Sequence, residues 1–73
     1  MKILSVLQQG QRRRLQKAIS ARVYQLTSVR NAQSVLFKAL YSALKERYNV
    51  DSYKSINPKD LQTAIRFIEN WKG

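Results

Sequence analysis

The sequence has 73 residues, of which 14 are Lys or Arg and 4 are Asp or Glu, so the formal net charge is +10. It contains no His and no Cys, which excludes the usual zinc ligand sets, a disulfide framework and thiol-based or His-based catalysis. Its two glycines, Gly10 and Gly73, are too few for a phosphate-binding loop. We therefore expect a binding module for an anionic ligand rather than an enzyme, with no cofactor and no metal.

The length predicts one small domain. A chain of this size has room for a single core, and its apolar fraction of 44% is typical of a folded protein. No apolar run approaches the length of a membrane span, and the apolar stretch near the N-terminus is too short for a signal peptide. We expect a lead or short helical turn over residues 1–10 and a single helical domain over residues 11–73, working in the cytoplasm.

The spacing of apolar residues predicts a first helix over residues 11–27. At 100° per residue, Leu15, Ile19 and Val23 fall on one face of this helix. The opposite face is basic and includes Tyr24. Such a helix buries one stripe against a core and presents the other to solvent.

A second helix is predicted over residues 32–48. Apolar residues cover more than half of its circumference, so we expect it to be the central and most buried helix, in contact with both neighbours. Either Ser28 or Asn31 is expected to cap its first turn. Asn49 follows its last residue and tolerates the left-handed conformation in which many helices end.

Residues 49–57 are predicted to form an ordered loop, because apolar residues recur in it every three positions and are expected to dock on the core. A third helix is predicted over residues 58–71, with Asn57 as its N-cap and Pro58 in its first position. The apolar residues on either side of this start form a hydrophobic staple. The expected fold class is therefore all-α, a compact bundle of three main helices. The docking residues are Val50, Tyr53 and Ile56, and the staple pairs Ile56 with Leu61.

The positive charge is concentrated in the first half of the chain, where residues 1–36 carry seven cations and no acid. Arginine forms forked contacts with phosphate, and neighbouring glutamines can reach phosphates or base edges. A basic helix face also serves as a solubilising surface, but the net charge favours nucleic acid. The second helix would extend the strip if its exposed edge lies alongside the first. The candidate nucleic-acid-binding residues are Arg12, Arg13, Arg14, Lys17, Tyr24, Lys38 and Lys45.

The aromatic residues have a second interpretation. Tyr24 is placed to stack on a base, or else to close the edge of the core or meet a partner subunit. The others are spaced as core residues more than as a stacking platform. The four carboxylates are explained by a helix start and by pairing with cations better than by a metal site. These other aromatic residues are Phe37, Tyr41, Tyr48, Tyr53, Phe67 and Trp71.

Residues 41–56, YSALKERYNVDSYKSI, resemble a known family. In the small C-terminal domain of bacteriophage and prophage antirepressor-type regulatory proteins, a Leu-Lys-x-Arg-aromatic helix end precedes Gly-Val-x-Ser-Tyr-Lys-x-Ile. This chain is similar, with Asn49 in place of the glycine, and residues 18–26 resemble the family's first helix. The resemblance implies a regulatory protein of phage origin in a bacterial host cell, either free-standing or part of a longer protein. It carries over no functional residues.

The leading hypothesis is a phage-type regulatory domain that binds double-stranded DNA mainly through phosphates, in control of phage gene expression. RNA also fits a basic helix. The alternative is a protein–protein interaction module without direct DNA contact, either an antirepressor that binds a phage repressor or an oligomerisation domain that forms a homodimer. Binding to a membrane surface is disfavoured, because the apolar face of the first helix is needed for the core.

Overall fold

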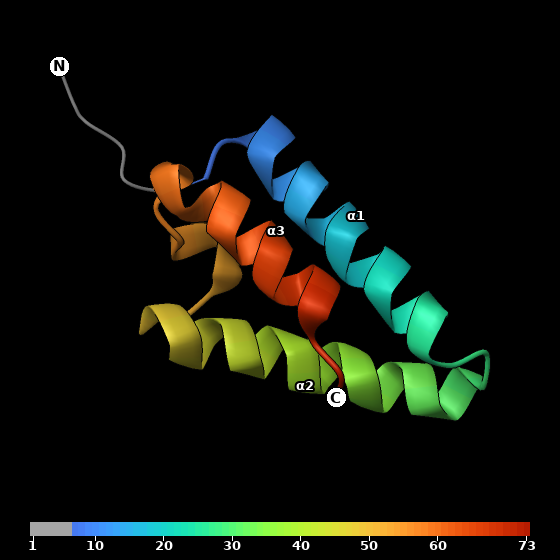
Figure 1. The fold of residues 1–73 in the computed structure, drawn as a ribbon. Helices are drawn as coiled ribbons and strands as arrows, with labels where there is room; N and C mark the ends of the chain where they lie inside the picture. The colour runs from blue at the N-terminus through green and yellow to red at the C-terminus, as the bar shows by residue number, and fades with distance from the viewer. Residues whose placement is uncertain (1–6) are drawn as a thin grey trace, which may run out of the picture.

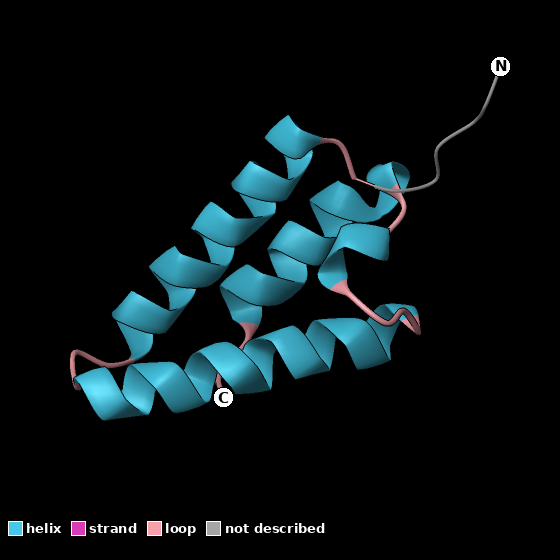
Figure 2. Cartoon of the chain, turned by 180° about the vertical axis from the view of Figure 1, so that it is seen from behind, coloured by secondary structure: helices cyan, strands magenta, loops and turns pink. Residues whose placement is uncertain are grey.

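The computed structural model describes residues 7–73, in which helices joined by short loops are the only regular structure and no strand is present (Figures 1 and 2). This confirms the predicted all-α bundle of three helices. The helix boundaries differ from the predicted ones by up to three residues. The largest difference is at the start of the third helix, where the predicted first turn is a separate 3₁₀ turn. The elements in order are α1 (Gln9–Leu26), α2 (Arg30–Tyr48), the 3₁₀ turns η1 (Tyr53–Ser55) and η2 (Pro58–Asp60), and α3 (Leu61–Asn70).

The helices α1 and α2 meet at a three-residue connection and diverge from it, with α3 lying between them in the view of Figure 1. The last turn of α1 ends where the Thr27 N–H donates to the Val23 carbonyl over 3.1 Å. The segment after α3 runs towards α2 (Figure 1), where Gly73 lies beside Leu36, and the Arg22 Nε of α1 donates to the Trp71 carbonyl in this segment over 2.7 Å. One flank of α1 therefore faces α3 and Trp71.

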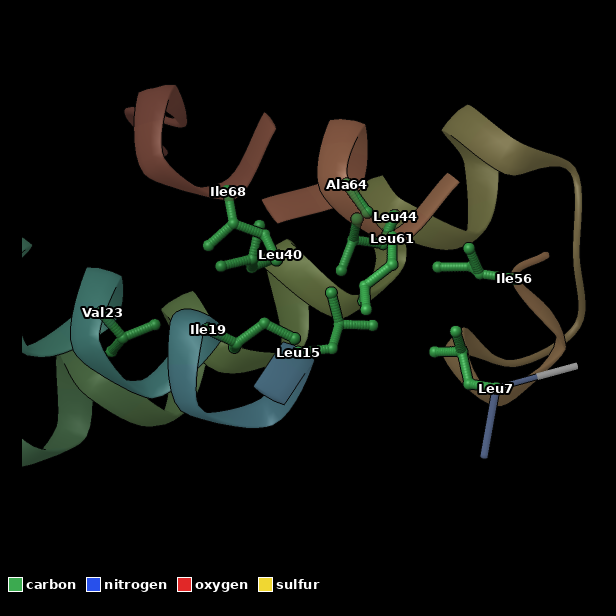
Figure 3. Close-up of a cluster of buried hydrophobic side chains, with 10 residues drawn as sticks. All are labelled: Leu7, Leu15, Ile19, Val23, Leu40, Leu44, Ile56, Leu61, Ala64 and Ile68. Atoms are coloured by element: carbon green, nitrogen blue, oxygen red, sulfur yellow. The ribbon is translucent and has the colours of Figure 1, made fainter. Parts of the chain in front are cut away.

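The core lies between the three helices and extends towards η1 and η2 (Figure 3). Helix α2 contributes only Leu40 and Leu44 to it, fewer than α1 or α3, and its Val35 is 65% exposed. The prediction that this helix is the most buried one is therefore wrong. An apolar helix face becomes buried only where neighbouring elements pack against it. In α2 this is the side that carries Leu40 and Leu44. The buried residues are Leu7, Leu15, Ile19, Val23, Leu40, Leu44, Ile56, Leu61, Ala64 and Ile68.

The end of α2 is as predicted, but its start is not. Asn49 adopts the left-handed conformation with φ 53° and ψ 51°. The N-cap is Val29, with no side-chain cap, so neither Ser28 nor Asn31 has the predicted role. Instead Thr27 organises the connection, since its Oγ1 accepts from the Val29 N–H over 3.1 Å and its carbonyl accepts from the Gln33 side chain, also over 3.1 Å.

The start of the third helix follows the predicted chemistry. The Asn57 Oδ1 accepts a hydrogen bond from the Lys59 N–H over 3.0 Å, and Pro58 occupies the first position of η2. Ile56 and Leu61, the two residues of the predicted staple, are both buried in the core. The loop before them is ordered as predicted, with Val50 and Tyr53 packed against that core.

Of the predicted lead or short helical turn over residues 1–10, residues 1–6 lie outside the described residues, whereas Leu7 is 1% exposed and belongs to the core. Its N–H donates to the Lys54 carbonyl over 3.1 Å, and its carbonyl accepts from the Arg12 Nη1 over 3.0 Å. Figure 3 shows Leu7 at the same end of the core as Ile56. Leu7 is thus held in place by both its buried side chain and its backbone, which is hydrogen-bonded to η1.

Candidate nucleic-acid interface

The arginine triplet at the start of α1 divides between two roles. Arg13 and Arg14 are exposed, whereas Arg12 is partly buried and donates to the Leu7 carbonyl. The helical period explains the difference, because Arg12 lies seven residues before the buried Ile19 and therefore on nearly the same side of α1. Arg12 thus holds the preceding segment in place, and its two neighbours face solvent.

The flank of α1 that faces away from α3 carries the remaining candidates of this helix. Lys17 lies seven residues before Tyr24, so their side chains leave α1 in similar directions, and both are exposed. Tyr24 is 58% exposed and makes an edge-to-face contact with Phe37 of α2, with ring centroids 5.9 Å apart. On the same flank, the Gln16 Nε2 donates to the Tyr53 hydroxyl of η1. This flank therefore borders both α2 and η1.

A hollow of about 550 Å³ lies on the adjoining flank of α2. Its two lysines, Lys38 and Lys45, are exposed, and its two aromatic residues, Phe37 and Tyr41, are half-buried. Because Phe37 also contacts Tyr24, the hollow adjoins the exposed aromatic residue of α1. No acidic residue lines the hollow. Its lining consists of Ser34, Phe37, Lys38, Tyr41, Ser42 and Lys45.

Tyr41 packs against a second tyrosine and is partly buried. Its ring lies 5.3 Å from that of Tyr53, at an interplanar angle of 50°. Desolvation by burial, and to a smaller extent the neighbouring Tyr53, raises the pKa of Tyr41 above its usual value of 10.0. The hydroxyl is therefore neutral at physiological pH, and the fixed charge of the hollow is that of its lysines.

The chain matches the family model of the ORF6C domain over residues 1–73. It belongs to the ORF6C domain family. This is a phage-associated domain, as the resemblance of residues 41–56 implies. Comparisons with curated proteins and with solved structures find no match to the chain.

A second hollow of this ORF6C domain, of about 430 Å³, adjoins the first at the C-terminal end of α2. Its lining includes the carboxylates of Glu46 and Asp51, and it shares Lys45 with the first hollow. Lys45 therefore has acidic neighbours on one side and none on the other. Within residues 7–73, no cluster of three carboxylates is placed to hold a metal ion. No helix of the same part of the chain is long and apolar enough to cross a membrane.

The sequence analysis did not include Phe37 and Tyr41, which line the first hollow, among the candidate binding residues, because their spacing is typical of core positions. No aromatic side chain of the ORF6C domain belongs to the fully buried core; those at the predicted core positions pack around it. A signal was present in the sequence. Phe37 and Tyr41 are one turn apart and lie on the same flank of α2 as Lys38 and Lys45, seven residues apart.

Proposed function

We propose that this ORF6C domain is a non-enzymatic, phage-type regulatory domain that binds DNA through one face of the molecule. We define the α1–α2 basic face as Arg13 and Lys17 of α1 together with Lys38 and Lys45 of α2. The observation that supports this proposal is the hollow on α2, which is lined by two exposed lysines and no acidic residue, and whose Phe37 contacts Tyr24 on the flank of α1 that carries Lys17. The exposed Arg14 and Tyr24 lie at the edge of this face, and Arg12 contributes only indirectly.

The affinity would come mainly from phosphate neutralisation, since each cation that contacts a phosphate releases condensed counterions from the DNA. The seven residues between Lys38 and Lys45 correspond to about 10 Å along α2. At that separation the two flexible side chains reach different phosphates rather than the same one. The two lysines can therefore contact separate phosphates of the same strand.

The experiment is a salt series on a short labelled DNA duplex of arbitrary sequence. Four phosphate contacts predict that log K falls against log salt with a slope of about −3.6. Removing two of them with Lys38→Ala and Lys45→Ala should reduce the slope to about −1.8 and weaken binding similarly for any duplex. Fluorescence anisotropy across about 50–200 mM salt measures both quantities.

The matched control removes the same charge elsewhere. The variant Arg66→Ala with Lys72→Ala also lowers the net charge by two, but these exposed residues lie on α3 and the segment after it. It should keep the slope of the unmodified protein. Equal losses from both double variants would contradict the assignment to the α1–α2 basic face, and a slope near zero would contradict DNA binding by phosphate neutralisation.

The alternative function is a protein-binding module, for example an antirepressor domain that occupies the acidic surface of a phage repressor. Val35 of α2 and Val29, the residue before this helix, are exposed and favour this function, because they add apolar surface outside the basic face. A stable complex with the phage's repressor that withstands high salt, together with absent DNA binding, would support this function instead.

A further inference from the structure

This inference rests on the proposed function and concerns the form of the nucleic acid. The hollow on α2 combines two partly exposed aromatic side chains with two lysines and two serine hydroxyls. We propose that it receives an unpaired base, and that the ligand of the α1–α2 basic face is therefore a single-stranded segment rather than an intact duplex. The lysines would hold the phosphates on either side of that base.

The aromatic residues are placed to offer a stacking surface. Phe37 and Tyr41 are one turn apart on α2 and only half-buried, so part of each ring borders the hollow. Their positions are supported from the side by Tyr24 and Tyr53, at centroid distances of 5.9 and 5.3 Å. In a duplex the faces of each base are covered by its neighbours in the stack. Only an unpaired base can present a free face to such a surface.

The size and polarity of the hollow agree with such a ligand. A volume of about 550 Å³ is within the range of pockets that bind small organic groups. Ser34 and Ser42 supply hydroxyls that can donate to or accept from the polar edge of a base. The lining has two cations and no carboxylate, so its positive charge is complementary to the negative charge of a nucleic-acid backbone. An acidic peptide would use the lysines but would leave the aromatic surface without a function.

The test compares three ligands with the same number of phosphates: a single-stranded DNA, the same strand with abasic sites throughout, and a hairpin duplex. Stacking of one base on an aromatic side chain predicts that the normal strand binds about 5-fold or more tightly than the abasic strand. The duplex should bind no better than the abasic strand. Equal binding of the normal and abasic strands would overturn the inference and leave the proposed function intact. Failure of all three to bind at low salt would overturn both.

A pair of variants assigns the effect to the hollow. Phe37→Leu keeps an apolar side chain but removes the ring, and should lower the affinity for the normal strand about 5-fold or more while leaving the abasic strand unchanged. Phe67→Leu is the matched control, since Phe67 is also half-buried but lies in α3 with Arg47 over its ring at 5.1 Å. It should change neither affinity. Equal losses from both variants would overturn the inference.

A measurement on the unmodified protein is independent of whether these variants fold. A strand that carries the fluorescent base 2-aminopurine should change its emission on binding, because stacking on an aromatic ring quenches it. Binding without any change in emission at every labelled position would overturn the inference. So would a polyglutamate peptide that binds as tightly as the single strand, because charge alone would then account for the affinity.

Discussion

Two tyrosine hydroxyls beside the loop after α2 have opposite environments. The Tyr48 hydroxyl is buried and has no hydrogen-bond partner within the described residues, whereas the Tyr53 hydroxyl accepts from the Gln16 side chain. A buried polar group without a partner costs free energy, and a hydrogen bond contributes about 1 kcal/mol. The same chemical change should therefore have different effects at these two positions.

We predict that Tyr48→Phe leaves the free energy of unfolding unchanged or raises it by up to about 1 kcal/mol. Tyr53→Phe should lower it by about 0.5–1.5 kcal/mol, because the Gln16 amide loses its partner. Urea unfolding followed by circular dichroism measures both. A larger loss for the Tyr48 variant than for the Tyr53 variant would contradict the described environments.

Among the elements, the connection between the start of α1 and η1 depends on Leu7, which was not predicted to be part of the core. Leu7 is 1% exposed, and its backbone is hydrogen-bonded on both sides, to Lys54 of η1 and to Arg12 of α1. Leu7 therefore connects the start of the first helix to the loop after the second. Its contribution is to packing rather than to the α1–α2 basic face.

We predict that Leu7→Ala lowers the free energy of unfolding by about 2–5 kcal/mol, since it removes buried methyl groups and leaves a cavity. Val35→Ala is the control, because Val35 is 65% exposed and its truncation should change the stability by no more than about 0.5 kcal/mol. Chemical or thermal unfolding measures both variants. Similar stabilities of the two would show that Leu7 is not part of the core.

For the whole molecule, a net charge of +10 on 73 residues predicts that charge repulsion opposes folding. Raising the ionic strength from about 0.01 to 0.1 M shortens the screening length from about 30 to about 10 Å. The free energy of unfolding should then rise by on the order of 1 kcal/mol, which thermal unfolding in the two buffers measures. The free energy of unfolding of the Arg66→Ala, Lys72→Ala variant should rise less with ionic strength, because its net charge is lower by two. A fall in stability with salt would indicate that attractive pairs outweigh the repulsion.

The candidate site was only partly predictable from the sequence. The exposed cations of α1 follow from helical periodicity, and the position of Arg12 near the buried stripe follows from its seven-residue spacing to Ile19. The packing of α2 against α1 decides which flank of α2 adjoins Tyr24. The contact between Tyr24 and Phe37 shows that it is the flank with Lys38 and Lys45. No local pattern carries that information, because either flank of α2 has exposed positions.

By itself the sequence determined the helices, the left-handed Asn49 and the start of η2 at Asn57 and Pro58. All of these depend on interactions between residues a few positions apart. Only the tertiary structure decided that α2 is the least buried helix, that Leu7 belongs to the core and that lysines and aromatic side chains share one hollow. These features depend on which surfaces of distant segments meet, and periodicity shows that a face is apolar without showing what covers it.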